Sequence, residues 1–280
     1  MYHIETLPDD YEKGTLSELV NGVPYTKIPY TNEYHPHATN IACYVIRFEE
    51  ETPAKWLLDN MDKKGRIWHH FKFPFYEDFP EEWVGGLAQG LTISALIRMY
   101  EKTKDKTYLK GALLAYKGLK FCIKDYWIYE YPGVPSVLNG NLYALLGIWD
   151  LIKYFKIEET KRFFFKIENN ISSNLSQYDI KYGWSYYDLV KKLPATRFYH
   201  KVHVALLKTL GSYTKDDVLL NYSLSWSTYL GRYNEKIANM HRLLKLWKQN
   251  GTKGMLKKQK MIKAWKVNET PRLCDGKRCP

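Results

Sequence analysis

A short acidic and aromatic segment, residues 129–140 (YEYPGVPSVLNG), holds the side chains with the clearest chemical potential. It places the carboxyl group of Glu130 beside the phenol of Tyr131. Asn139 and Gly140 follow at the start of a long apolar stretch with helical spacing. A carboxylate next to a phenol predicts acid–base chemistry, in which one group removes a proton and another donates one.

Two tyrosine-rich blocks further along the chain are candidates to complete such a site. WSYYDL spans residues 184–189, and FYHKVHV spans residues 198–204. A phenol has a pKa of about 10 in water, and nearby cations lower that pKa. The three segments together therefore predict a proton-transfer site that uses tyrosines instead of a metal ion or a nucleophilic Ser or Cys.

Apolar residues at helical spacing predict helices joined by alternately short and long connections. Residues 1–35 are expected to form an extended arm that packs onto the body, and helices begin near residue 36. Turn residues between aromatic runs predict a small hairpin or loop pair within residues 56–83. The later helices are expected in pairs, 84–103 with 107–125, 136–155 with 158–176, and 199–211 with 215–231, followed by a shorter helix over 235–249.

This pattern favours an all-α fold, an incomplete (α/α) barrel or toroid built from helix hairpins. The tyrosine-containing segments fall in long connections, which such a fold gathers at one end. An α-solenoid is the alternative, but no repeat of fixed period is visible. We therefore expect an N-terminal arm (1–35), a catalytic toroid domain (36–249) and a basic C-terminal tail (250–280).

The charge is distributed unevenly. The formal net charge is +12, but residues 241–280 alone hold 12 Lys and Arg against 2 acidic residues. The body is therefore nearly neutral, which argues against a nucleic-acid-binding role, and we expect the tail to be a frayed, solvated extension. No signal peptide or membrane-spanning stretch is recognisable, so a cytoplasmic location is the default expectation.

Cysteines and histidines give little sign of a metal site. Cys43 and Cys122 lie in apolar helix-like runs and are expected to be buried free thiols. Cys274 and Cys279 flank DGKR, a weak signal for either a disulfide or a metal site. His200 and His203 are three residues apart on an expected helix, but a third ligand is not evident. We expect neither a metal nor a cofactor.

Four blocks, in the same order along the chain, resemble one family. They are WVGGLAQGLTISALIRMYEKTKDKTYL (83–109), YEYPGVPSVLNG…LLGIWDL (129–151), YDIKYGWSYYDL (178–189) and YHKVHVALLKTL (199–210). They are similar to the C-terminal catalytic domain of the D-glucuronyl C5-epimerases, which act on heparan-type glycans. That family has an incomplete α/α barrel. Tyr129 stands where the family has the first of two acids, so Glu130 is the only carboxyl group of its motif.

The resemblance implies an isomerase that inverts C5 of D-glucuronate units to L-iduronate within a glycosaminoglycan-like polysaccharide such as heparosan or heparan sulfate. It places Glu130 and Tyr199 on opposite faces of C5. Tyr131 and Tyr187 would hold the carboxylate or the glycosidic region and assist proton transfer. The expected partner is an anionic, uronate-containing polysaccharide. The resemblance does not decide whether the protein is a homodimer. Animal members assemble dimers through a large β-rich region before the helices, whereas only residues 1–35 precede the expected helices in this sequence.

Six polar residues in or next to these blocks are candidates for substrate contact: Gln89, Arg98, Asn139, Arg197, His200 and His203. An Arg can bind a carboxylate through two parallel hydrogen bonds. For Arg98, a solvated position on a helix is equally consistent with the sequence. Asn139 is placed well to cap a helix that begins near residue 140. Structural roles are the alternative for both histidines.

Two other function classes remain open. A uronate polysaccharide lyase shares the removal of the C5 proton but then eliminates the 4-linked sugar. A non-catalytic glycan-binding relative would bind the polymer without exchanging that proton, and the loss of one acid at Tyr129 favours this class to some extent.

Overall fold

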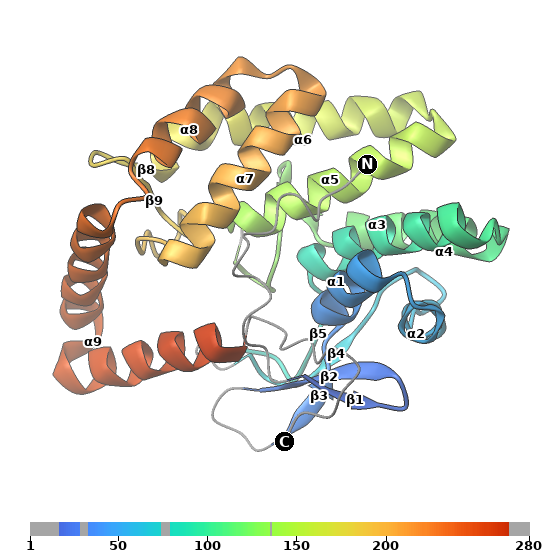
Figure 1. Ribbon diagram of the computed structural model, residues 1–280, viewed down its shortest axis with the longest axis horizontal. Coiled ribbons are helices and arrows are strands. Elements are labelled where there is room, and N and C mark those ends of the chain that lie inside the picture. The colour runs from blue at the N-terminus through green and yellow to red at the C-terminus, as the bar shows by residue number, and fades with distance from the viewer. Residues whose placement is uncertain (1–16, 29–32, 74–78, 135, 269–280) are drawn as a thin grey trace.

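The computed structural model describes residues 17–28, 33–73, 79–134 and 136–268 (Figure 1). These residues are mostly helical, in agreement with the expected all-α class. The described helices are α1 (Ala38–Phe48), α2 (Glu51–Asp59), α3 (Gly86–Thr103), α4 (Lys106–Lys120), α5 (Leu138–Phe155), α6 (Glu158–Tyr178), α7 (Arg197–Thr214), α8 (Asp217–Thr228) and α9 (Arg232–Asn268).

Small antiparallel sheets occupy several of the connections. The strands are β1 (Ser17–Val20), β2 (Val23–Lys27), β3 (Tyr34–Pro36), β4 (His69–His70), β5 (Glu82–Trp83), β6 (Ile123–Lys124), β7 (Trp127–Ile128), β8 (Asp179–Ile180) and β9 (Trp184–Ser185). The first three form one sheet in the order β1-β2-β3, and the others form two-stranded pairs, β4 with β5, β6 with β7 and β8 with β9.

The helix hairpins predicted from the sequence are present as α3–α4, α5–α6 and α7–α8, each with boundaries close to those expected. Figure 1 shows these hairpins side by side along the body. Helix α2 was not predicted. The β4–β5 pair lies within the region where a hairpin or loop pair was expected. Closure of the helices into an incomplete barrel stays a prediction. None of the described helices is long and apolar enough to cross a bilayer.

The described part of the predicted arm is a three-stranded sheet. Its first turn, Asn21–Gly22, has positive φ at both residues, 51° and 79°. That geometry suits a two-residue hairpin and is typical of an Asn-Gly pair. Val23 of β2 joins the main hydrophobic core, and the Asn40 amide of α1 donates to the Thr26 hydroxyl at 2.7 Å. The sheet is therefore packed against α1.

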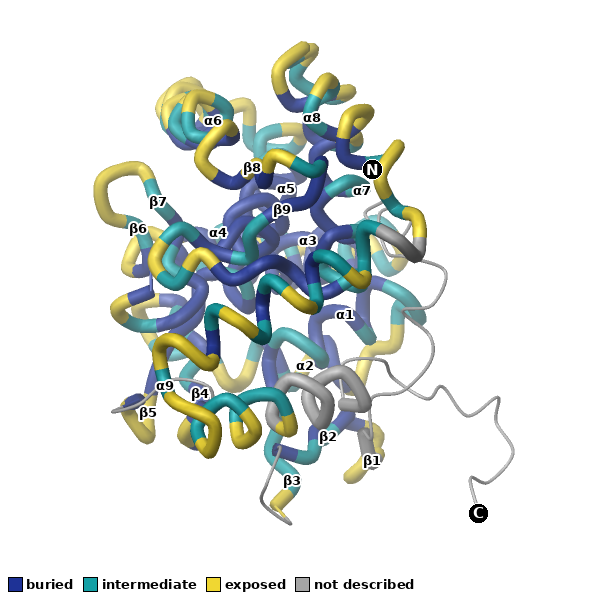
Figure 2. The backbone as a smooth tube through the Cα atoms, turned by 90° about the vertical axis from the view of Figure 1, so that its left-hand side faces the viewer, coloured by how far each residue is buried: buried dark blue, intermediate teal, exposed yellow. Residues whose placement is uncertain are grey.

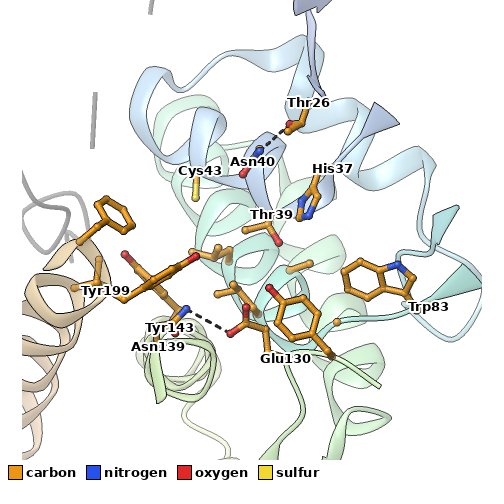
Figure 3. A pocket seen from close by; sticks show the side chains of 17 residues that line it. Thr26, His37, Thr39, Asn40, Cys43, Trp83, Glu130, Asn139, Tyr143 and Tyr199 are labelled. Atoms are coloured by element: carbon orange, nitrogen blue, oxygen red, sulfur yellow. Dashed lines mark hydrogen bonds between the residues drawn. The ribbon is translucent and has the colours of Figure 1, made fainter. Parts of the chain in front are cut away.

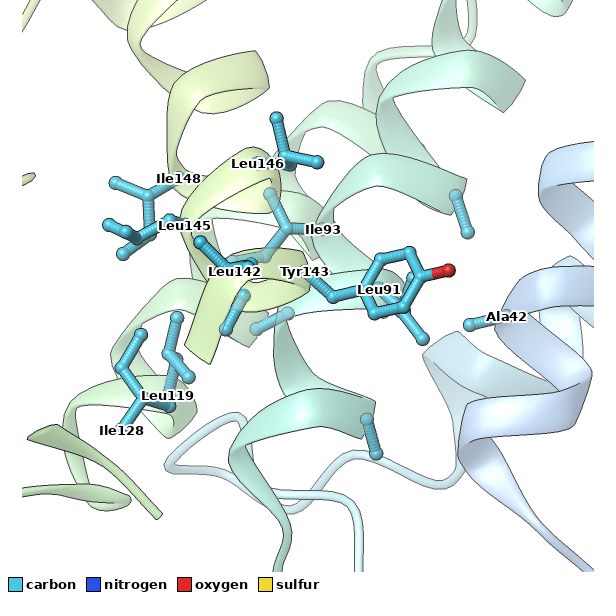
Figure 4. Close-up of a cluster of buried hydrophobic side chains, with 14 of the residues drawn as sticks. Ala42, Leu91, Ile93, Leu119, Ile128, Leu142, Tyr143, Leu145, Leu146 and Ile148 are labelled. Carbon is cyan, nitrogen blue, oxygen red and sulfur yellow. The ribbon is translucent and has the colours of Figure 1, made fainter. Parts of the chain in front are cut away.

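The centre of the core is the contact between α3 and α5, two helices with buried small residues at their closest approach (Figure 4). A side chain at Gly90 would overlap the backbone of Ala144, and one at Gly147 would overlap the backbone of Gly90. Aliphatic side chains such as Leu91, Ile93, Leu142 and Leu145 fill the space around this contact. The two helices thus form a rigid support for the segments at their N-terminal ends.

The C-terminal helix is longer than predicted. Helix α9 continues to Asn268. Its first part, before Gly251, agrees with the shorter helix expected over 235–249, whereas its second part is helical up to Asn268, where a frayed extension was expected. A break at Gly251, with φ 64° and ψ −178°, divides α9 into two pieces that run in different directions (Figure 1). Only glycine adopts such a conformation readily. The predictions for Cys274 and Cys279 lie outside the described residues, whereas Cys43 and Cys122 are buried free thiols as expected.

Candidate active site

A narrow cavity of about 80 Å³ lies among α1, the N-terminal end of α3, the loop before α5 and the N-terminal end of α7 (Figure 3). Glu130, Tyr131 and Asn139 come from the loop and the first turn of α5, and Tyr199 comes from α7. Trp83 of β5 lies on the side of the cavity away from α7. Segments far apart in the sequence thus contribute to a single cavity.

Glu130 is the acid of this cavity, with only 3% of its surface exposed. Burial raises the pKa of Glu130 to about 7, and the carboxylate of Asp188 adds to this effect. Hydrogen bonds from Tyr131 and Tyr187 act in the opposite direction but are outweighed. The Tyr187 hydroxyl donates to Oε1 at 3.5 Å, and the Asn139 amide donates to Oε2 at 3.4 Å. Near neutral pH, the carboxyl group is therefore able both to accept and to donate a proton.

The backbone around Glu130 is fixed by neighbouring polar and small residues. The Asn141 amide accepts from the Ile128 N–H at 2.8 Å and donates to the Ile128 carbonyl at 3.0 Å. The Gly86 N–H donates to the Tyr129 carbonyl at 2.8 Å. Gly140 has no side chain where the Glu130 carboxylate lies, and a methyl group at that position would overlap the carboxylate. The sequence Asn-Gly at the start of α5 thus serves to make room for the acid and to hold it.

Three tyrosines surround the acid. Tyr131 is buried and stacks on Phe73, with ring centroids 4.6 Å apart. Tyr187 packs edge-on against Tyr199 at 4.8 Å between centroids. The backbone of Tyr187 is held on both sides, because its N–H donates to the Leu193 carbonyl at 2.9 Å and its carbonyl accepts from the Leu138 N–H at 3.1 Å. The structure therefore brings together all four residues predicted to be catalytic.

Helix α1 and strand β2 complete the cavity with residues that sequence reasoning missed. His37, Thr39 and Asn40 line it, together with Thr26. Burial lowers the pKa of His37 to about 4, so its imidazole is neutral at pH 7. The available signal was the cluster of polar residues around His37, at the expected start of the first helix, because residues in connecting segments often carry function.

Three cavity-lining residues have buried polar atoms without a hydrogen-bond partner among the described residues. These atoms are Nδ1 of His37, Oδ1 of Asn139 and the hydroxyl of Tyr143. Buried polar atoms normally have partners, because an unmade hydrogen bond costs about 1–3 kcal/mol. A ligand with polar groups would satisfy them, so the cavity is suited to a polar molecule.

Two predicted substrate contacts are placed elsewhere. Gln89 is fully buried, accepts from the Ile67 N–H at 2.9 Å and donates to the carbonyls of Gly65 and Ala115. Arg98 is also buried and donates to the Ile46 carbonyl at the end of α1. Neither residue lines the cavity, so the positions of both favour structural roles. The alternative of a solvated Arg98 is wrong, because the side chain is buried.

The remaining predicted contacts on α7 also lie outside the cavity. Arg197 forms an ion pair with Glu235 of α9 at 3.0 Å. His200 and His203 are buried, and Nδ1 of each lies 2.8 Å from the Ser185 hydroxyl. His200 also stacks on Trp184 at 4.0 Å between centroids. These contacts tie α7 to its surroundings, whereas the sixth candidate, Asn139, does line the cavity.

Burial also lowers the pKa of His200 to about 4, and it holds the pKa of His203 well below its usual value. Both imidazoles are therefore neutral at pH 7. In the part of the chain that the structure describes, no group of three or more His, Cys, Asp or Glu side chains could hold a metal ion.

Comparison with known proteins relates most of the chain to one family. Residues 61–228 match the family model described as D-glucuronyl C5-epimerase C-terminus. The chain is 30% identical over 236 residues to a D-glucuronyl C5-epimerase of Caenorhabditis elegans, an alignment that covers 72% of this chain and 36% of the worm protein. It is also 28% identical over 177 residues to an uncharacterised protein of Methanocaldococcus jannaschii, which covers 57% of this chain and 56% of the archaeal protein.

The chain thus spans about a third of the worm protein's length and about half of the archaeal protein's length. The matched residues include Glu130, Tyr187 and Tyr199, whereas the wall formed by His37 and Asn40 lies before the match. Through residues 61–228, the chain belongs to the D-glucuronyl C5-epimerase family, as a relative of the C-terminal domain of those enzymes.

Proposed function

We propose that this protein inverts the configuration at C5 of D-glucuronate units in a heparosan-like polysaccharide and so produces L-iduronate units. The observation that carries the proposal is the buried carboxyl group of Glu130, whose pKa is raised to about 7, in one cavity with Tyr199 and in contact with Tyr187. Family membership supports the same class of reaction.

The reaction needs two proton-transfer groups. The C5–H bond of a uronate is acidic only because C5 is next to the carboxyl group. Removal of that proton forms an enediolate-like intermediate, and return of a proton to the opposite face inverts the centre. Each transfer requires a group within hydrogen-bond reach whose pKa suits the operating pH. No bond to the neighbouring sugars breaks, and oxidation state does not change.

Glu130 is assigned as the base that removes the C5 proton. A carboxylate with a pKa near 7 is a stronger base than an ordinary one, yet a large fraction of it is ionised at neutral pH. Tyr199 is assigned to the other face, where its phenol donates the returning proton. Tyr131 and Tyr187, which contact the acid, would hold its oxygens in position during the transfer.

The cavity walls would hold the uronate carboxyl group. Nδ1 of His37 is buried there without a partner among the described residues, and in the tautomer that carries its proton it can donate to the carboxyl group and stabilise charge that develops on its oxygens. Oδ1 of Asn139 is likewise without a partner there, and as an acceptor it is suited to a hydroxyl group of the sugar. Because the cavity is narrow, it is suited to the C5 edge and the carboxyl group, with the flanking sugars outside it.

The proposal is tested by incubating the protein with heparosan in deuterated water and analysing the product by NMR. We expect deuterium at C5 together with the appearance of iduronate. Absence of exchange with heparosan, N-sulfated heparosan and other glucuronans would contradict the proposal. Unsaturated, ultraviolet-absorbing chain ends would show elimination and would assign the protein to the lyases instead.

The role of Tyr199 is tested with Tyr199→Phe, which removes only the hydroxyl group. We expect exchange to fall by about 10²–10⁴-fold, the usual contribution of a general acid or base. Tyr213→Phe is a matched control on the same helix, because Tyr213 stacks on Trp149 and does not line the cavity. Equal activity of both variants would remove Tyr199 from the mechanism.

A further inference from the structure

A second cavity, of about 630 Å³, lies on the surface between the β6–β7 hairpin and helix α6. Two aromatic residues, Tyr126 and Phe163, and three basic residues, Lys120, Arg162 and Lys166, line it. Figure 2 shows that the hairpin tip is exposed and lies near α6. None of these residues contributes to the cavity around Glu130.

The hairpin keeps an aromatic residue where glycine would fit better. Asp125 and Tyr126 form its two-residue turn, with φ of 50° and 58°. Turns of this kind favour Asn-Gly or Asp-Gly, since a residue with a side chain pays about 1–2 kcal/mol in the left-handed region. Tyr126 is 42% exposed, so core packing does not account for its presence. A strained residue that persists in this way points to a function for the side chain.

The surroundings of Tyr126 combine flat apolar faces with positive charge. Its ring lies 6.3 Å from that of Phe163, and the Lys166 ammonium lies 5.6 Å from its centroid. Lys120 and Glu159 form an exposed ion pair at 3.8 Å, an arrangement that contributes little and exchanges readily with other anions. With Arg162 added, three cations outnumber the two carboxylates, Asp125 and Glu159.

We propose that this second cavity is an accessory site for an anionic oligosaccharide. The aromatic faces would stack on sugar rings, and the cations would pair with carboxylate or sulfate groups. The choice of a uronate polymer as ligand rests on the proposed function. Tyr126 precedes Glu130 by four residues, so their Cα atoms are at most about 14 Å apart. The two cavities therefore lie close together in the molecule, and the proposal is that one polymer chain binds at the accessory site while one of its sugars occupies the catalytic cavity.

The test measures the binding of heparosan to the full chain by calorimetry at low and at physiological salt, because charge pairing at an exposed site weakens as salt rises. Tyr126→Gly and Arg162→Ala are each expected to weaken binding about tenfold. Tyr126→Gly relieves the backbone strain, so its melting temperature should equal or exceed that of the unmodified protein. Loss of binding in that variant is therefore distinguishable from unfolding.

Lys161→Ala is the matched control, since it removes one positive charge from an exposed position on the same helix outside the cavity. Tyr126→Gly and Arg162→Ala variants that bind as well as Lys161→Ala would overturn the accessory site, and so would absence of heparosan binding by the unmodified protein. Binding that depends on Tyr126 and Arg162 without any C5 exchange would overturn the proposed epimerase activity and leave the accessory site standing.

Discussion

Two buried polar clusters in this molecule derive from the same sequence blocks and differ in how their hydrogen bonds are used. One surrounds Glu130 and lines the cavity. The other links Ser185, His200 and His203, and does not reach the cavity. In the histidine cluster, His200 has partners for both ring nitrogens, and only Nε2 of His203 lacks one among the described residues.

The difference shows how motif residues divide between chemistry and support. Around Glu130, Asn139 keeps an unpaired oxygen, and the acid has a strongly raised pKa. Both features cost folding free energy, so their presence at a cavity is best explained by a ligand. Burial instead keeps the histidines of the second cluster neutral and joined to their neighbours, as expected of a cluster that holds α7 in place.

The largest expected effect is a loss of activity on substitution in the cluster around Glu130. Glu130→Gln keeps the size of the side chain but removes the proposed base, and we expect C5 exchange to fall by about 10³-fold. Circular dichroism and thermal unfolding should show a folded protein. Exchange within a fewfold of the unmodified rate would show that Glu130 is not the base, and the two clusters would then not differ in function.

The second prediction concerns stability and pH. Because the raised pKa of Glu130 means that the folded protein holds this proton more tightly, the stability that the group contributes is complete below about pH 4.5 and is lost as pH rises through about 7. Glu130→Gln removes this dependence. The free energy of unfolding of this variant minus that of the unmodified protein should therefore rise by about 3 kcal/mol between pH 4 and pH 8.

Denaturant unfolding at several pH values checks this difference. Burial also raises the pKa of Glu168 to about 7, but that residue is present in both proteins, so its contribution cancels. A difference that stays constant with pH would mean that Glu130 keeps an ordinary pKa in the folded state.

The third prediction displaces the acid without removing it. Gly140→Ala would push a methyl group against the Glu130 carboxylate. Because a misplacement of about 1 Å can cost about 10²-fold in rate, we expect exchange to fall by that factor. Gly231→Ala is the matched control, since no atom lies within 4 Å of its added methyl group. Equal rates for the two variants would show that the position of the carboxyl group is not critical.

The smallest effect is expected in the histidine cluster. Ser185→Ala removes the hydroxyl that joins His200 and His203, and should lower the free energy of unfolding by about 1–3 kcal/mol. Activity per folded molecule should stay within about twofold of the unmodified protein. A large loss of activity with unchanged stability would instead place the histidine cluster in the catalytic machinery.

The sequence was sufficient to predict the helix hairpins, because helical periodicity is a local signal. The grouping of Glu130 with the three tyrosines was expected from the resemblance of the ordered blocks to one family. The sequence was insufficient for Gln89, Arg98 and Arg197, whose polar side chains bond to buried backbone or to another helix. Membership of a motif does not tell whether a polar side chain faces a cavity or a carbonyl group.

The failure to predict the cavity wall that contains His37 and Asn40 has a different cause. His37 and Asn40 meet Glu130 only through tertiary packing, and no spacing along the chain relates them to it. The described sheet of the N-terminal segment, by contrast, had a local signal in Asn21–Gly22, a pair typical of tight hairpins.

The close contact of Gly90 with Ala144 also has a consequence for the order of folding. It joins positions 54 residues apart, and the loop between them includes α4, the β6–β7 hairpin and Glu130. Loop closure of this length costs little more than that of a shorter loop, so the two helices can dock early. We expect a bulky substitution at Gly90 to slow refolding rather than only to speed unfolding. The loop that carries Glu130 would then take its final shape last, between helices that are already in place.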